Sequence, residues 1–562
     1  MKKLIIPVAT LVASFALFAL APASAFGRQD RAGLTYIDRG DIGTLDPNRM
    51  SWMQDIRVGN GLWEGLYSID PVTFKPILAT ADKADQSDDK TVWTFHIRTD
   101  ARWSNGDPVT SHDFVFAWKR MLEEPGDYTY LLDQYIKGAK EYEDAFADYI
   151  AQRTAGKHAS APDFSMVGIE AVDTNTLRVT LKHPVTFFPD LCAFPCYFPL
   201  NERAMNSFRE VNPKTEQVTY KAAWATPPNL VSNGPYKLVR WQLRVGMRLE
   251  QNPHYWDKAN MKNTSVEVKV AEDPLTQLRM YDANEVDLLT ELKGSLAASL
   301  RDAGRRDIHI DPSFGTYFYS FNCSKELPGG RPNPFADIRV RQALTMAIDK
   351  KPIVDNITKC GENVTTQYVP PGVFDGYQAA EGLPFDIKRA RALMKEAGYP
   401  AGKNFPPLKL LYNTDGDHKE TAEYVANQWQ KNLNIKIDLE GVEIKQFQQR
   451  LHNKDYDVAR ASWYGDYMDI STFTDKYLSW SLNNDSNWIN AEYDDLCKRA
   501  AYEADPQKRF EMLAKAENIL NQEVPILPLY NYVNKTLYRD KLKGLNPNPR
   551  NIVVLKAIWV EP

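Results

Sequence analysis

The stretch VWTFHIR at residues 92–98, continued by WSNGDPVT at 103–110 and DFVFAW at 113–118, carries the clearest structural signal in this 562-residue chain. Its first segment is rich in β-branched and aromatic residues, which is typical of a strand. Asn105-Gly106 favours a tight turn, because glycine adopts left-handed backbone conformations without strain. The apolar spacing of the last segment indicates a helix. The stretch therefore predicts a strand, a turn and a helix.

The same two patterns alternate along the rest of the chain. Residues 386–398 predict a helix that begins at the N-cap Asp386 and stops at Gly398, and residues 340–348 predict another. Residues 422–433 have helical apolar spacing and residues 435–439 alternate as in a strand. This alternation predicts an α/β protein.

Three segments are polar or rich in Pro and Gly, so we expect exposed loops at 83–90, 141–161 and 327–334. The third is either a linker between lobes or a simple surface loop.

The first 25 residues differ from the remainder. Lys2 and Lys3 precede an uncharged apolar run at 4–20, which is followed by Pro22 and by Ala23-Ser24-Ala25. This order is typical of a cleaved secretory signal. A transmembrane anchor is the alternative, because the run approaches the length that spans a bilayer. We expect a periplasmic mature protein without a lipid anchor, since no cysteine lies near the cleavage point.

Composition and motifs exclude several classes of function. The formal net charge of −5 argues against a nucleic-acid partner. Searches for the serine-hydrolase elbow, the zinc-protease helix motif, the C-x-x-C pair and the phosphate loop find nothing. The eight histidines are scattered. We therefore expect no enzymatic activity, no cofactor and no metal.

The five cysteines are odd in number, so at least one thiol is unpaired within the chain. Disulfides are permitted outside the cytoplasm, and Cys192 with Cys196 or Cys323 with Cys360 are candidate pairs. Metal binding is the weaker interpretation, because no histidine flanks these cysteines at ligand spacing.

Several segments together resemble one family, the extracellular solute-binding proteins of peptide importers (family 5, cluster C). They are residues 92–118, 232–236, 252–256, 337–344 and 395–399, and the resemblance extends over nearly the whole mature chain.

The resemblance implies a two-lobe periplasmic-binding-protein fold of type II, with the chain crossing between lobes near residues 311 and 532. The expected domains are a signal peptide at 1–25, lobe I at 26–70, 204–310 and 533–562, a subdomain inserted into lobe I at 71–203, and lobe II at 311–532.

Within the family, the segment YDVARASWYGDY at residues 456–467 is most similar to oligopeptide-binding proteins. The resemblance implies that Asp466 binds the α-ammonium of a peptide and that Arg460 meets its α-carboxylate. It also implies that the backbone of 461–465, which includes Ser462, Trp463 and Tyr464, pairs with the peptide. A closed cleft needs such groups, because a peptide is a zwitterion and an unpaired buried charge is costly. Without the resemblance, Asp466 is a surface carboxylate, Arg460 a structural ion pair and Trp463 a core residue.

Other positions are carried over more loosely. His418 matches the residue that meets the carboxylate of longer peptides, or else it is a solvated loop histidine. Ser51 and Met53 fall where the ligand backbone is met from the opposite lobe. Phe116 and Tyr532 match aromatic cleft positions, with core packing an equal alternative for each.

By this resemblance, the sequence departs in three places from the oligopeptide-binding proteins that it is similar to. Ile444 replaces a tryptophan, Ser51 replaces an acidic residue, and Gly315 with Tyr464 stand where a disulfide can occur. These departures put the length and side-chain preference of the ligand in doubt.

The resulting hypothesis is a monomeric protein that captures short peptides by hinge closure and delivers them to the permease subunits of an ABC importer. The alternatives are the same fold with another solute (a murein peptide, a nickel complex or a sugar), a secreted peptidase, and a chemosensory or structural role.

Overall fold

The computed structural model describes residues 33–38, 40–414, 416–481, 483–503 and 505–561. The expected signal peptide at residues 1–25 lies outside the described residues. No helix in the described part of the chain combines the length and the apolar character needed to cross a membrane.

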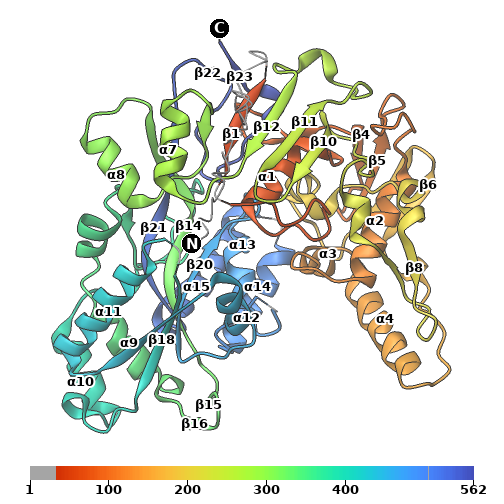
Figure 1. The fold of residues 1–562 in the computed structure, drawn as a ribbon. Coiled ribbons are helices and arrows are strands. Elements are labelled where there is room, and N and C mark those ends of the chain that lie inside the picture. Colours follow the sequence, from red (N-terminus) through yellow and green to blue (C-terminus); the bar gives the residue numbers. More distant parts are fainter. Residues whose placement is uncertain (1–32, 39, 415, 482, 504, 562) are drawn as a thin grey trace, which may run out of the picture.

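A long mixed sheet runs through the molecule (Figure 1). Its strands follow the order β10-β11-β12-β1-β13-β21-β14-β20-β18-β19, and β17 pairs with β21. Their bounds are β1 Leu34–Ile37, β10 Tyr236–Gln242, β11 Gly246–Gln251, β12 Ser265–Lys269, β13 Leu288–Leu289, β14 Ile308–Phe321, β17 Asn363–Val364, β18 Leu408–Asn413, β19 Ile437–Val442, β20 Val458–Tyr464 and β21 Ile526–Tyr538.

A separate four-stranded antiparallel sheet, β4-β5-β7-β6, lies with α2 to α4 at the side of the molecule. The strand, turn and helix predicted first are confirmed as β5 (Val92–Ile97), a turn at Gly106 with φ of +90°, and α2 (Ser111–Glu123). Thr110 and Asp113 form a reciprocal capping box that fixes the start of α2. The other elements are β4 Ala81–Gln86, β6 Ile169–Asp173, β7 Thr176–Thr180, α3 Tyr130–Tyr135 and α4 Ala139–Thr154.

The helices predicted in the second half are also confirmed. The side chain of Asp386 accepts a hydrogen bond from the Arg389 N–H at 2.9 Å and caps α10 (Ile387–Glu396). The helix ends before Gly398, which has φ of +93°. The neighbouring elements are α9 Ile338–Met346, α11 His418–Leu433, α12 Ile444–His452, α14 Ala491–Tyr502 and α15 Pro506–Glu523.

Regular structure occupies part of each of the three predicted loops, so the prediction of irregular loops was only partly right. Residues 83–86 belong to strand β4, the exposed edge of its sheet, where polar residues face solvent, and residues 87–90 lie in the loop that follows it. Helix α4 occupies most of 141–161 and buries only a narrow stripe that includes Tyr142, Phe146 and Tyr149. Residues 327–334 contain a short hairpin of β15 (Glu326–Leu327) and β16 (Arg331–Pro332), not a linker between lobes.

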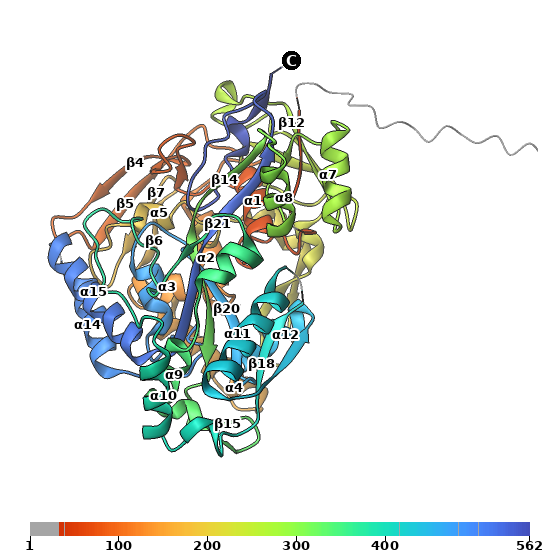
Figure 2. The same ribbon diagram turned by 90° about the vertical axis from the view of Figure 1, so that its left-hand side faces the viewer.

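The hydrophobic cores divide the molecule. One large core is built from residues 34–288 together with Tyr467, Leu542, Val553, Leu555 and Ile558. Three others lie within residues 314–530. We call the parts around these cores lobe I and lobe II. Strands β14 and β21 run side by side from one part to the other (Figure 2). The expected crossing points, 311 and 532, fall in these strands, whereas the full domain boundaries stay a prediction.

All five cysteines are free thiols, and four of them are buried. The two candidate disulfides are therefore absent. Burial raises the pKa of the Cys360 thiol to about 11 and that of the Cys323 thiol also to about 11, which keeps both protonated near neutral pH.

Candidate functional site

Strand β20 is an internal strand along one half and an open edge along the other. On one side it pairs with β14 over its whole length, from Phe321↔Val458 to Gly315↔Tyr464. On the other side β18 pairs with Val458 and Ala459 alone. Within the described part of the chain, no strand covers this second side from residue 460 to residue 464.

The direction of the backbone groups along this open edge follows from the ladder. The Gly465 N–H donates to the Phe314 carbonyl at 2.8 Å, and antiparallel pairing alternates from there. Ala461 and Trp463 therefore direct their N–H and C=O groups at β14. The groups that face the open edge belong to Arg460, Ser462 and Tyr464. An extended chain laid along this edge would find donors and acceptors in register.

Arg460 lies at the start of the open edge. Its Nη2 donates to the Tyr532 hydroxyl at 2.8 Å, and its guanidinium lies 5.1 Å from the centroid of the Tyr317 ring. No carboxylate of the described residues lies within ion-pair distance of it, and the buried Nε finds no described acceptor. The structural ion pair considered above is therefore not seen, and the cation is available to an anionic group.

An aromatic surface surrounds Arg460 on one face of the sheet. Side chains alternate along a strand, so Ser462 and Tyr464 project to the same face as Arg460. The Tyr464 ring stacks on Tyr532 with centroids 4.8 Å apart. Tyr317, opposite Ser462, stacks on Tyr530 at the same distance.

His418 borders this surface, with its ring 5.5 Å from Tyr317. It is the first residue of α11 and is buried, so it is not a solvated loop residue. The structure thus brings Arg460, Ser462, Tyr464, Tyr532 and His418 together.

Asp466 lies just beyond the other end of the open edge. Its carboxylate accepts hydrogen bonds from the hydroxyls of Tyr128 at 2.9 Å and Tyr130 at 3.2 Å, both from lobe I. Its own N–H donates to Thr472 Oγ1 at 2.9 Å. Burial raises the pKa of Asp466 to about 6, although the tyrosine hydrogen bonds act in the opposite direction. A partly buried carboxylate with neutral partners can accept a cation such as an ammonium group.

Trp463 points to the face opposite Arg460. Its indole N–H donates to the Thr472 carbonyl at 2.7 Å, and Lys476 Nζ lies 4.7 Å from its ring. The ring also packs against a core of lobe II. Trp463 therefore fixes the loop that carries Asp466.

Three of the expected site residues are not joined to this group. Phe116 packs against the lobe I core, with its ring 5.9 Å from that of Tyr220. Ser51 and Met53 lie at the start of α1 (Met53–Leu62) and are partly exposed. Among the described residues, no hydrogen bond, ion pair or ring contact connects any of the three with β20.

The loop after β20 is inserted into lobe I. Tyr467 is 1% exposed within the lobe I core, where its ring stacks on Phe187 at 4.7 Å. Asp190 accepts a hydrogen bond from the Met468 N–H at 2.8 Å and pairs with Arg550 at 2.8 Å. Arg550 in turn donates to the Asp466 carbonyl at 2.6 Å. We call Asp190, Arg550 and Tyr467 the clasp, because they hold the Asp466 loop against lobe I.

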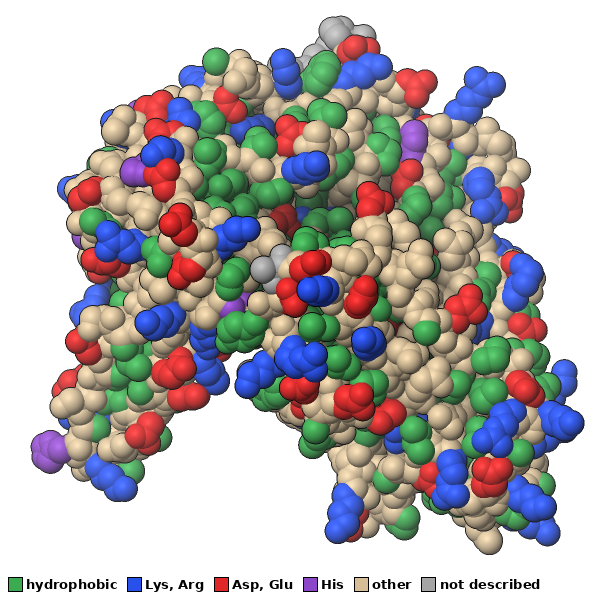
Figure 3. Space-filling model, turned by 180° about the vertical axis from the view of Figure 1, so that it is seen from behind, with side chains coloured by type: hydrophobic (Ala, Val, Ile, Leu, Met, Phe, Trp, Pro, Cys, Tyr) green, Lys and Arg blue, Asp and Glu red, His purple; other side chains and the backbone are tan. Residues whose placement is uncertain are grey.

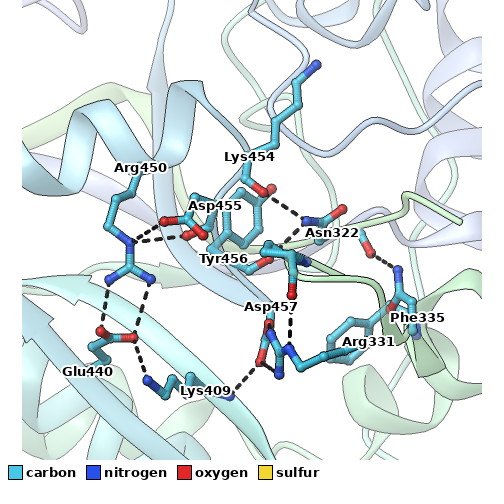
Figure 4. A network of polar contacts seen from close by, with 12 residues as sticks. Asn322, Arg331, Phe335, Lys409, Glu440, Arg450, Lys454, Asp455, Tyr456 and Asp457 are labelled. Carbon is cyan, nitrogen blue, oxygen red and sulfur yellow. Dashed lines mark hydrogen bonds and ion pairs between the residues drawn. The ribbon is translucent and has the colours of Figure 1, made fainter. Parts of the chain in front are cut away.

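A hollow of about 400 Å³ lies before the start of β20, near residues 455–457 (Figure 4). Its charged residues neutralise one another. Arg450 pairs with Glu440 at 2.9 Å, Arg331 pairs with Asp457, and the Lys409 N–H donates to Asp457 at 3.0 Å. We interpret this network as structural, since no charge in it lacks a partner. Over the face shown in Figure 3, basic and acidic side chains are likewise intermingled.

Sequence reasoning missed Tyr128, Tyr130, Tyr317, Arg550 and Asp190. Tyr128 lies 338 positions from the carboxylate it contacts. No local pattern could connect such residues, although Tyr128 and Tyr130, at the start of α3, are a visible aromatic cluster.

The molecule has two lobes joined by two strands. An open strand edge lies between the cation of Arg460 and the anion of Asp466. This arrangement defines a two-lobe binding protein. Comparison with known proteins gives the family. A model of the bacterial extracellular solute-binding proteins, family 5 (middle region), matches residues 73–485. The chain belongs to this family.

The chain is 32% identical to the periplasmic oligopeptide-binding protein OppA of Salmonella typhimurium, over 98% of both chains. Its fold matches the Escherichia coli murein tripeptide-binding protein MppA with a TM-score of 0.81 and 28% identity, covering 94% of this chain and 99% of that one. It matches Haemophilus influenzae OppA in complex with the peptide RPPGFSPFR with a TM-score of 0.79 and 29% identity, over 94% and 99%.

Proposed function

We propose that this protein captures short peptides by closure of its two lobes and delivers them to the permease subunits of an ABC importer. The observation that carries the proposal is the open edge of β20, flanked by Arg460 and Asp466. A peptide running antiparallel to β20 places its amino end at Asp466 and its carboxyl end at Arg460. The relatives named above, which bind oligopeptides or a murein tripeptide, support the same class of ligand.

The finer parts of the proposal rest on sequence. The signal at residues 1–25 supports export to the periplasm with no lipid anchor. The protein acts as a monomer without catalysis, cofactor or nucleic-acid partner. Capture needs no bond-making chemistry, so backbone contacts with fixed positions accept many side chains.

Native mass spectrometry of the purified protein tests the ligand class. Retained masses that fragment as peptides are the expected result. A retained bile acid, sugar or metal complex would contradict the proposal, and cleavage of added peptides would indicate a peptidase.

Calorimetry with amino-blocked peptides tests the site. Asp466→Asn should weaken binding of a free peptide by about 3 kcal/mol, because it leaves the ammonium unpaired, and should leave its N-acetyl counterpart nearly unaffected. Asp88→Asn, at an exposed position next to β4, is the matched control. Equal losses for both peptides would show that Asp466 does not bind the ammonium.

A further inference from the structure

The ring of Tyr464 is an exposed aromatic surface at the open edge. The residue is 43% exposed, although its backbone belongs to the continuous β14–β20 ladder. The residue opposite it is Gly315, where an added Cβ would lie 2.6 Å from Tyr464 Cδ1. The ring therefore lies flat over a position that only glycine leaves free.

The ring is also held from behind. It stacks on Tyr532 at 4.8 Å with an angle of 20° between the planes. The Tyr532 hydroxyl in turn accepts the hydrogen bond from Arg460. One face of Tyr464 is thus packed in a fixed geometry, and the exposed part is presented next to the open edge.

We propose that Tyr464 is a specificity-determining residue: its ring receives one side chain of the bound peptide and favours an aromatic side chain there. The inference rests on the proposed function. In an antiparallel pair, directly opposite residues project to the same face with Cβ atoms about 5 Å apart. The ligand residue opposite Tyr464 therefore projects its side chain over the exposed ring.

The charges nearby decide which side chain is preferred. An aromatic ring packs on another in offset or edge-to-face geometry. A cationic side chain is also attracted to an aromatic ring. Here, however, Arg460 donates a hydrogen bond to Tyr532, which stacks on Tyr464, and its positive charge repels a cationic side chain of the ligand. The site therefore favours Phe, Tyr or Trp over Lys or Arg at this ligand position.

Calorimetry with alanine-based peptides of three to five residues, with phenylalanine placed at each position in turn, tests the inference. We expect one position at which phenylalanine binds more tightly than alanine and than lysine. Tyr464→Leu should weaken the phenylalanine peptide about three- to tenfold more than its alanine counterpart, and Tyr464→Phe should keep the preference.

A second variant moves the ring without removing it. Gly315→Ala should displace the Tyr464 ring and reduce the same preference. Phe385→Leu, which removes an exposed aromatic ring before α10, is the control and should keep it.

Two results would overturn the inference while the proposed function stands: an aromatic preference that Tyr464→Leu leaves intact, or a loss of affinity equal for all peptides. If no peptide binds to the unaltered protein, the proposed function fails, and the inference fails with it.

Discussion

Asp466 combines a raised pKa with a proposed role in binding the peptide ammonium group. Burial raises its pKa to about 6, so below that pH the carboxyl group is protonated and neutral. A peptide α-amino group has a pKa of about 8 and is neutral above it. The proposed ion pair exists only between these values.

Peptide affinity should therefore be greatest between about pH 6 and pH 8 and fall up to tenfold per pH unit outside that window. Titration calorimetry from pH 4.5 to pH 9 measures this profile. Asp466→Asn should remove the decline on the acid side. An unchanged acid decline in that variant would assign it to another group.

Glu517 predicts a different pH effect, on stability. It is buried in α15, where its carboxylate accepts hydrogen bonds from the N–H groups of Tyr368 and Val369. Burial nevertheless raises its pKa from 4.5 to about 7. The folded state therefore holds a proton that the unfolded state releases between about pH 4.5 and pH 7, and the stability contribution is lost as pH rises through that range.

The free energy of unfolding of the original protein, minus that of Glu517→Gln, should fall by about 3 kcal/mol from pH 4.5 to pH 8. Denaturant unfolding at both values measures it. Glu511→Gln, an exposed change on the same helix, should show no such trend. A constant difference for Glu517→Gln would mean that this carboxyl group is ionised in the folded protein at both pH values.

At the scale of elements, β20 predicts opposite effects for adjacent residues. The N–H of Ser462 faces the open edge, whereas that of Ala461 bonds to β14. Proline is tolerated where the N–H is not part of the ladder. Ser462→Pro should fold but bind peptides about tenfold more weakly, because one ligand hydrogen bond is lost.

Ala461→Pro should instead lower the unfolding temperature, since it removes a bond of the ladder itself. Circular dichroism melts and calorimetry distinguish the two variants. Normal affinity in Ser462→Pro would show that peptides do not pair with this edge.

The elements show which parts of the fold the sequence can predict. Helix α10 was predictable because its cap, apolar spacing and glycine stop all lie within thirteen residues. The edge strand β4 and helix α4 were missed because their exposed residues carry little apolar periodicity. At the candidate site, residues 460–466 could be proposed from the sequence because they form one contiguous motif. The tyrosines that contact Asp466 come from a distant segment, so only the folded chain shows them.

For the whole molecule, we expect the clasp to contribute to how firmly the two lobes hold together. Arg550→Lys keeps the buried charge but loses the paired geometry with Asp190 and the bond to the Asp466 carbonyl. We expect a larger radius of gyration without ligand in small-angle X-ray scattering. Peptide dissociation should be about tenfold faster in stopped-flow measurements.

Arg240→Lys, at a surface ion pair with Glu267, is the control for a change of the same chemistry. If both variants keep the original radius and dissociation rate, the clasp does not hold the lobes together.

The ladder between the two strands that join the lobes is interrupted twice, between Pro312 and Thr316 and between Tyr317 and Phe318. The β14–β21 ladder passes from Pro312↔Val533 directly to Thr316↔Asn531, so residues 313–315 face Tyr532 alone. We expect rotation of one lobe against the other to concentrate at these interruptions, because a bulge bends its strand and leaves residues unpaired. Gly315 and Tyr532 would then lie close to the rotation axis. Atoms near a rotation axis move least. The surface that these residues form with Tyr464 should therefore keep nearly the same shape while the lobes close. A ligand can then contact this surface before the outer parts of the lobes have moved.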